Sequence, residues 1–266
     1  MNPLTSVNFY ITSECDSKCK FCFSNHGKKR LTRNNAIRVI DMLRKNGTQK
    51  ITFGGGEPTL HESLPDFVNH ANSIGMKTAI VTNGSKLNEV IQFCKPSWVA
   101  LSLDSGCRAT QILIGRGKAN YISRTINLAD KCRSLGIKLK VNTVVCSYNI
   151  KEDMTSIVKR IAPNRWKIFQ VLPTNPSARP LEITKNQFSK FVKRNTIKDI
   201  TIIPEDINAM CQSYILIDPL GRFYHSDIRW PHEYSQPILS VGVIKAFRQV
   251  SFDFNKLKER GGIYEW

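Results

Sequence analysis

The chain has 266 residues, 41% of them hydrophobic, and carries 39 Lys and Arg against 21 Asp and Glu, a formal net charge of +18. This apolar fraction excludes a disordered chain, and the length suits one large α/β unit or two small ones. No run approaches the roughly 18 apolar residues of a membrane helix, and the first residues lack a signal-peptide pattern, so we expect a cytoplasmic protein without membrane attachment. The positive net charge predicts a polyanionic partner.

Hydrophobic periodicity in the first two thirds of the chain alternates between the pattern of strands and that of helices. Strands are expected at six places, namely 7–11, 50–53, 78–82, 98–103, 137–145 and 165–172. Helices are expected between them, at 32–47, 64–74, 87–94, 121–135 and 151–161. The alternation predicts an α/β fold with a parallel sheet covered by helices, which we interpret as a partial (β/α)6 barrel over residues 1–173.

The rhythm changes after Pro173. A helix is expected at 185–193, and short strands at 199–203, 214–217 and 222–224. No segment rich in Gly, Ser or Pro separates this region from the barrel. We therefore expect residues 174–266 to form a C-terminal α+β extension that closes the barrel and packs on it as one structural unit.

Three cysteines, Cys15, Cys19 and Cys22, lie within eight residues directly after the first expected strand, while the other five are scattered. In a reducing compartment this distribution favours a metal site over a disulfide framework. The spacing is compatible with zinc and a fourth ligand, for which His26 is the nearest candidate, or with a [4Fe–4S] cluster that has one iron without a protein ligand.

The C-x3-C-x2-C spacing, with Phe21 before the third cysteine, resembles the radical S-adenosylmethionine (SAM) superfamily. So does the segment 54–58, Gly-Gly-Gly-Glu-Pro, at the end of the second expected strand. The resemblance implies a radical SAM barrel whose cysteines hold a [4Fe–4S] cluster, while Gly55, Gly56 and Glu57 contact the amino group of SAM. It also implies an electron donor, such as a flavodoxin or ferredoxin, whose electron cleaves SAM to a 5′-deoxyadenosyl radical.

Several cations are expected on the interior face of the barrel. In the strand over 138–144, Lys140 and Asn142 share the face opposite to the apolar side chains. Arg165 and Lys167 repeat this spacing, and Lys50 begins the second strand. Cations inside a barrel are costly unless an anion meets them, so the pattern favours a nucleoside triphosphate ligand. The alternative is that these strands turn their polar faces to solvent.

Local matches in the same order over nearly the whole chain are similar to the viperin family of radical SAM enzymes. They lie at 6–8, 19–23, 50–58, 82–85, 113–117, 152–155, 164–170, 213–216 and 260–262. The resemblance implies a lyase that converts a nucleoside triphosphate to its 3′-deoxy-3′,4′-didehydro form, a chain terminator, after abstraction of the C4′ hydrogen. It also implies an antiviral role.

The same resemblance assigns residues to roles. Asn83, Ser102 and Arg116 fall at SAM-contacting positions, and Tyr214 matches a tyrosine proposed to deliver hydrogen to the substrate radical, with a core aromatic as the alternative. The triphosphate positions are matched by Lys50, Lys140, Asn142, Arg165 and Lys167.

The chain also departs from the family. Animal viperins begin with an amphipathic membrane-binding helix and continue beyond the position of Trp266, and Gly54 replaces a family serine. CTP, UTP and GTP therefore all remain as substrates. We expect a monomer without a stable nucleic-acid partner. The rival hypotheses are a radical SAM enzyme that modifies RNA and a non-enzymatic Fe–S or zinc interaction module.

Overall fold

The computed structural model describes residues 3–22, 24, 28–117, 120–225 and 233–260. Their backbone forms a curved ten-stranded sheet with the order β10-β9-β8-β1-β2-β3-β4-β5-β6-β7. The strands that follow chain order are β1 (Ser6–Thr12), β2 (Lys50–Gly55), β3 (Lys77–Thr82), β4 (Trp98–Ser102), β5 (Lys138–Val145), β6 (Arg165–Gln170) and β7 (Thr201–Glu205). Each pairs with the next in parallel, which confirms the expected partial (β/α) barrel.

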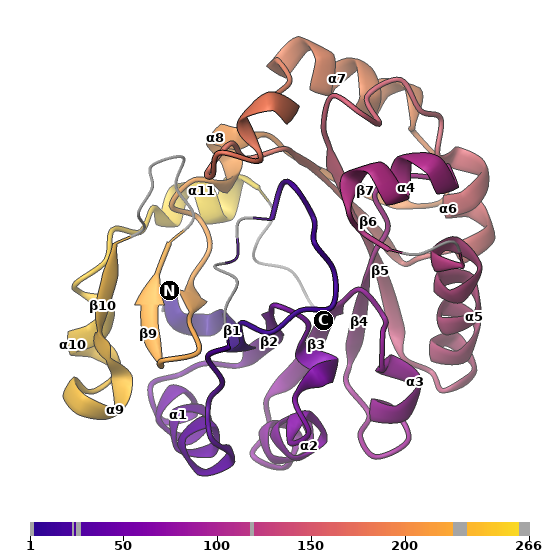
Figure 1. Cartoon of the computed structure of the whole chain (residues 1–266). Coiled ribbons are helices and arrows are strands. Elements are labelled where there is room, and N and C mark those ends of the chain that lie inside the picture. The colour runs from indigo at the N-terminus through magenta and orange to yellow at the C-terminus, as the bar shows by residue number, and fades with distance from the viewer. Residues whose placement is uncertain (1–2, 23, 25–27, 118–119, 226–232, 261–266) are drawn as a thin grey trace.

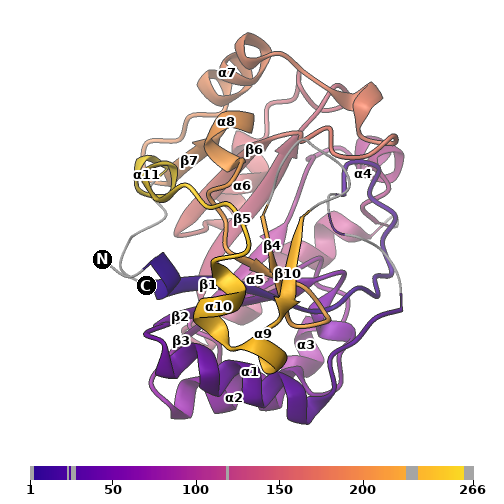
Figure 2. The same ribbon diagram turned by 90° about the vertical axis from the view of Figure 1, so that its left-hand side faces the viewer.

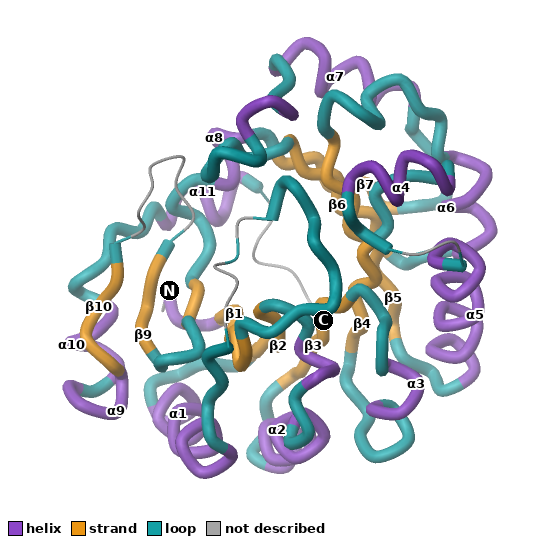
Figure 3. The backbone as a smooth tube through the Cα atoms, in the orientation of Figure 1, coloured by secondary structure: helices purple, strands orange, loops and turns teal. Residues whose placement is uncertain are grey.

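The outer face of the sheet is covered by helices, while the strands line the inside of the curve (Figures 1 and 3). In the barrel segment these helices are α1 (Arg33–Lys45), α2 (Leu64–Ser73), α3 (Leu87–Val90), α4 (Arg108–Ile114), α5 (Tyr121–Ser134) and α6 (Thr155–Ile161). Short 3-10 turns occur at Pro3–Thr5, Pro58–Leu60 and Arg179–Leu181. Two apolar clusters between sheet and helices form the core.

Helix α1 begins where its sequence predicts. The hydroxyl of Thr32 accepts a hydrogen bond from the backbone N–H of Asn35, as an N-cap does. Other boundaries differ from the sequence prediction. Helix α3 is shorter than expected, and α6 begins four residues late because Asp153 accepts from the backbone and hydroxyl of Thr155, a local turn that competes with the helix. Helix α4 was not expected at all.

The C-terminal segment adds strands to both edges of the sheet. Strand β7 lies beside β6 and begins and ends two residues later in sequence than predicted. At the other edge β8 (Leu216–Ile217) runs parallel to β1, and β9 (Arg222–Tyr224) and β10 (Tyr234–Pro237) follow antiparallel. The expected extension therefore lengthens the sheet at both edges but does not close the barrel as predicted, because β7 and β10 are the two edges of the described sheet.

The described part of this segment also contains the helices α7 (Lys185–Arg194), α8 (Ile207–Met210), α9 (Ile238–Val241), α10 (Val243–Phe247) and α11 (Phe254–Glu259). Helices α9 and α10 lie outside the sheet beside β10, and α8 and α11 lie next to each other near β7 (Figure 2). Across the described residues, no helix is both long and apolar enough to cross a membrane.

Candidate active site

The segment that carries the three cysteines follows β1 and is held from the side by the end of α4. The backbone N–H of Lys18 donates to the carbonyl of Gly115 (3.0 Å), and that of Lys20 donates to the carbonyl of Ile114 (3.0 Å). Gly115 has a φ of +85°, and a Cβ there would lie 2.1 Å from the Lys18 carbonyl oxygen. Only glycine permits this approach, so the unexpected helix α4 positions the cysteine segment.

Gly55 and Gly56 hold the same segment from another direction. A Cβ on Gly55 would lie 2.1 Å from the carbonyl oxygen of Thr12, and one on Gly56 would lie 2.1 Å from that of Glu14. The end of β2 thus packs directly against the backbone that precedes Cys15. The structure shows that these glycines allow close approach of the chain to itself, and their contact with SAM stays a prediction.

Glu57 is almost completely buried (1% exposed) and is held by four donors of the protein. Its carboxylate accepts from the backbone (3.0 Å) and hydroxyl (2.6 Å) of Thr59, the hydroxyl of Thr82 (2.5 Å) and the backbone of Asn83 (2.7 Å). Burial raises the pKa of Glu57 above its ordinary value, although these hydrogen bonds lower it in part. The visible role of Glu57 is to fix Asn83, and its expected contact with an ammonium group stays a prediction.

Asn83 connects the end of β3 to the cysteine segment. Its side-chain amide donates to Asp16 (2.7 Å) and to the hydroxyl of Ser17 (3.0 Å). The hydroxyl of Ser17 in turn donates to the carbonyl of Arg116 (2.9 Å). Asn83, Ser102 and Arg116 lie directly after β3, at the end of β4 and after α4, on the side of the barrel that carries the cysteines.

Arg116 forms a buried ion pair with Asp104, with 2.5 Å between Nε and Oδ2. Its guanidinium also lies 5.5 Å from the centroid of the Phe21 ring. Although burial disfavours the charge, Asp104 and Cys19 raise the pKa of Arg116 well above its usual value. A fixed positive charge therefore stands beside the cysteine segment, where it favours an anionic thiolate.

The three thiols are free and partly buried. Burial is the main cause that raises the pKa of Cys15 to about 11 and that of Cys22 to about 12, and neighbouring charges add to it. Burial also raises the pKa of Cys19, although the charge of Arg116 lowers it in part. Thiols with such raised pKa values lose their protons when a metal ion binds to the sulfur in place of the proton.

The donor set fits an iron–sulfur cluster. Three soft sulfur ligands lie on one segment beside a cation, and thiolates are the usual ligands of such clusters. Across the ranges that the structure describes, no three His, Cys, Asp or Glu side chains come close enough together to hold a single metal ion. His26, the candidate fourth ligand of a zinc site, lies outside the described residues.

The expected cations converge on the interior face of the barrel. In the register of β5 and β6, Lys140 pairs with Arg165 and Asn142 pairs with Lys167. Lys140 is only 6% exposed, and its ammonium lies 4.6 Å from the centroid of the Trp98 ring. Burial, then the charges of Lys167, Arg165 and Lys50, lower the pKa of Lys140 to about 6. These strands therefore turn their polar face inward; that the cations bind a triphosphate stays a prediction.

A network around Tyr214 links this cluster to the C-terminal segment. The Tyr214 hydroxyl accepts from the ammonium of Lys167 (2.7 Å) and donates to the carboxylate of Glu205. The guanidinium of Arg260 lies 3.8 Å from the centroid of the Tyr214 ring and donates to the carbonyl of Ser213 (2.8 Å). Burial and the nearby Glu205 raise the pKa of Tyr214 well above its usual value, so the phenol keeps its proton.

Sequence reasoning missed Glu205 and Arg260. The expected strand over 199–203 ended too early, although alternation from Thr201 would have placed Glu205 on the inner face with Ile203. Arg260 lies in a segment that carries the family resemblance, but the resemblance assigns no role to it. Its contact with Tyr214 joins two segments 46 residues apart, which no local pattern reveals.

Tyr10 connects the cysteine segment with this network. Burial, then Cys22 and Tyr214, raise the pKa of its hydroxyl, and its ring packs edge-on against Tyr224 with 6.1 Å between centroids. A Cβ on Gly54 would lie 3.0 Å from Cε1 of this ring. A serine at position 54 would therefore require the Tyr10 ring to shift by a few tenths of an ångström.

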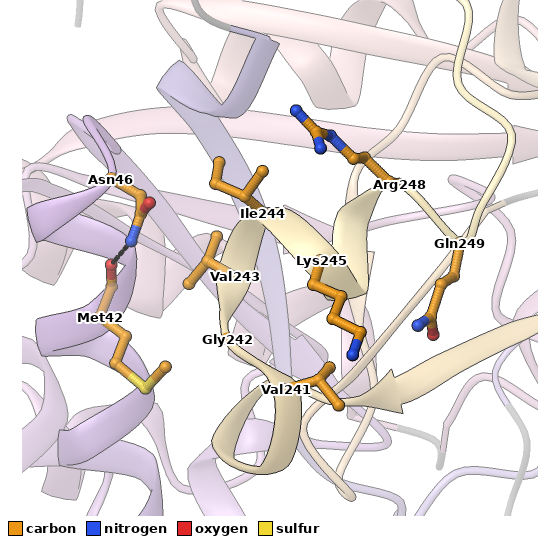
Figure 4. A pocket seen from close by; sticks show the side chains of 9 residues that line it. All are labelled: Met42, Asn46, Val241, Gly242, Val243, Ile244, Lys245, Arg248 and Gln249. Carbon is orange, nitrogen blue, oxygen red and sulfur yellow. Dashed lines mark hydrogen bonds between the residues drawn. The ribbon is translucent and has the colours of Figure 1, made fainter.

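A groove of about 730 Å³ lies elsewhere, between α1 and the α9–α10 segment (Figure 4). Val241, Val243 and Ile244 line it together with Lys245 and Arg248. None of the predicted site residues lies in it, so the groove and the candidate active site are separate features.

The sequence of the chain is similar to those of known proteins. Residues 9–161 match the profile of the radical SAM superfamily. The chain is 36% identical to an S-adenosylmethionine-dependent nucleotide dehydratase of Lacinutrix mariniflava, spanning all of this chain and 60% of that protein's length. It is 35% identical to a protein of the same name from Flammeovirga pacifica, spanning all of this chain and 97% of the relative.

Among solved structures, SuiB of Streptococcus suis bound to S-adenosylmethionine has a similar fold. The TM-score is 0.73 at 16% sequence identity, and the match covers 96% of this chain and 67% of that protein. At this identity the likeness concerns the fold alone.

Proposed function

Because the chain belongs to the radical SAM superfamily and, within it, to the S-adenosylmethionine-dependent nucleotide dehydratases, we propose that it converts a nucleoside triphosphate to the 3′-deoxy-3′,4′-didehydro nucleotide. The observation that carries this proposal is the convergence of Lys50, Arg165 and Lys167 on the buried Lys140. Four cations on an enclosed face suit the charge of one triphosphate better than the extended backbone of an RNA.

The cofactors are a [4Fe–4S] cluster, held by Cys15, Cys19 and Cys22, and SAM. When bound, they supply the 5′-deoxyadenosyl radical that removes the C4′ hydrogen of the ribose. Arg116 and Asp104 provide a fixed ion pair beside the thiols, and Glu57 together with Asn83 holds the cysteine segment against β3.

The remaining residues bind and orient the nucleotide. Lys50, Lys140, Arg165, Lys167 and Asn142 would hold the triphosphate at the inner face of β2, β5 and β6. A clamped triphosphate places one ribose C–H near the radical, which is the main requirement for selective abstraction. Tyr214 keeps its proton at neutral pH and lies beside Lys167, so it is suited to deliver hydrogen to the substrate radical.

The physiological setting follows from the family. We propose a monomer in the cytoplasm that receives electrons from a flavodoxin or ferredoxin, without stable binding to nucleic acid or membrane, and acts in antiviral defence. Residues 1–173 and 174–266 would act as one unit, because β7 to β10 continue the sheet of the barrel.

The proposal is tested with reconstituted protein under anaerobic conditions, with SAM, dithionite and one nucleoside triphosphate at a time. We expect one of CTP, UTP or GTP to stimulate formation of 5′-deoxyadenosine and to be converted to its didehydro product. Absence of stimulation by every triphosphate, combined with stimulation by an RNA, would replace the proposal with the RNA-modifying alternative.

A further inference from the structure

A buried carboxylate lies among the cations of the barrel interior. Glu205, the last residue of β7, is 0% exposed. Its Oε1 lies 2.5 Å from Nζ of Lys167 and 3.6 Å from Nη1 of Arg260, and its Oε2 accepts the hydroxyl of Tyr214. Burial raises the pKa of Glu205, but Lys167 and Arg260 together lower it below its ordinary value. Glu205 is therefore an anion at neutral pH.

An anion at this position has two consequences for a triphosphate. It already engages Lys167, one of the cations that the phosphates need, and its own charge repels them at short range in a medium of low dielectric. In the free protein the same charge is favourable, because it offsets the mutual repulsion of the cations that lowers the pKa of Lys140.

Glu205 also determines where the Tyr214 proton points. The hydroxyl receives a hydrogen bond from Lys167 and gives its only proton to Glu205. If Lys167 turns to a phosphate, Glu205 remains as the group that holds the phenol in place.

Building on the function proposed above, we propose that Glu205 is a positioning residue that acts as the resident counter-charge of the triphosphate site. In the free enzyme it pairs with Lys167. In the substrate complex the triphosphate takes Lys167 from it, and Glu205 then holds the phenol of Tyr214 in the position from which its hydrogen is transferred.

The first test is equilibrium binding of inorganic tripolyphosphate and of the preferred nucleoside triphosphate to the reconstituted protein. Glu205→Gln keeps the size of the side chain and its capacity for hydrogen bonding but removes the charge, so we expect binding about tenfold tighter than in wild type. Glu89→Gln removes a charge from the exposed surface of α3 and should leave binding unchanged. Glu205→Asp keeps the charge and should bind like wild type. A purely structural role would give weaker binding in Glu205→Gln, and that result, or unchanged affinity, overturns the proposal.

A second measurement separates positioning from binding. Glu205→Gln should form less didehydro nucleotide per 5′-deoxyadenosine at saturating substrate, by roughly tenfold, whereas Glu205→Asp should recover part of this ratio. An unchanged ratio in Glu205→Gln contradicts the orienting role.

A second variant tests the proposal even if Glu205→Gln does not fold. The variant Glu205→Gln/Lys167→Met replaces the ion pair as a whole and leaves no buried lysine without its partner. It should bind tripolyphosphate more tightly than Lys167→Met alone, and equal affinities contradict the proposal. If wild type binds no nucleoside triphosphate, the proposed function fails; if wild type binds but neither Glu205→Gln nor the double variant gains affinity over its parent, this inference alone fails.

Discussion

Lys140 lies on the interior face of the barrel, where burial and neighbouring charges lower its pKa far below the ordinary value of a lysine. Strand alternation was sufficient to predict that its side chain points inward with Asn142, and the packing of Leu139 and Val141 in the outer core agrees. Alternation did not reveal how strongly the neighbouring cations lower the pKa of Lys140. Burial and three neighbouring cations lower its pKa to about 6, so the side chain is mainly neutral at pH 7.5 in the free protein.

A bound triphosphate should reverse this effect. The phosphates favour the charged ammonium, so the pKa of Lys140 rises on binding and the protein takes up as much as about one proton per nucleotide above pH 6. Calorimetric titration in buffers of different ionisation enthalpy measures this uptake. Affinity should accordingly fall as the pH rises from 6 toward the pKa of the complex.

Lys140→Met serves as the variant and Lys138→Met as the matched control, since Lys138 is exposed at the start of the same strand. Lys140→Met should bind without proton uptake, whereas Lys138→Met should take up protons as wild type does. Proton release on binding in wild type would contradict the assignment of Lys140 to the triphosphate site.

At the scale of elements, α4 and β2 hold the cysteine segment between them through glycines. A side chain at Gly115 collides with the carbonyl of Lys18 and also meets an unfavourable φ. Gly115→Ala should therefore displace Lys18 and Cys19 while the sheet and its core remain folded. We expect the variant to lose most of its iron on reconstitution, with little change in circular dichroism.

Gly106→Ala is the control for this prediction, because it lies just before the same helix and a Cβ there makes ordinary contact with Ile157 at 3.4 Å. It should retain the iron content of wild type, which absorbance and iron analysis measure. Full iron content in Gly115→Ala would show that α4 does not position the cysteine segment.

The elements also show what the sequence can predict. The strands β1 to β6 were predictable because their apolar patterns alternate with helical ones, and the N-cap Thr32 marks the start of the first helix. Helix α4 was not, because Ile112 and Leu113 are about half exposed and its seven residues carry no amphipathic pattern. The cysteines and cations could be predicted from spacing. The role of Glu205 could not be predicted, because it depends on contacts with Lys167 and Arg260, which lie in distant segments of the sequence.

At the scale of the whole molecule, the net charge of +18 divides into an interior and an exterior part. In the part of the chain that the structure describes, the interior set consists of Lys140 with Lys50, Arg165 and Lys167, whereas the whole chain has 39 Lys and Arg. The residues of the interior set come from β2, β5 and β6, while Tyr214 and Arg260 approach from the C-terminal segment through Lys167 and Glu205. A ligand at this set would therefore connect elements on both sides of an open sheet.

Such a ligand should stabilise the whole fold against unfolding. At one hundred times its dissociation constant, a ligand that binds only the native state adds about 2.7 kcal/mol, which corresponds to a rise in Tm of roughly 5–10 °C for a chain of this size. Differential scanning fluorimetry should show this rise for nucleoside triphosphates and tripolyphosphate, a smaller one for diphosphates, and none for nucleosides. If the exterior charge instead bound a short RNA, binding would depend on many exposed cations and would be lost steeply between 50 and 200 mM salt. A stabilisation by RNA that equals that of the triphosphates and persists at 200 mM salt would show that the charge serves a polymer.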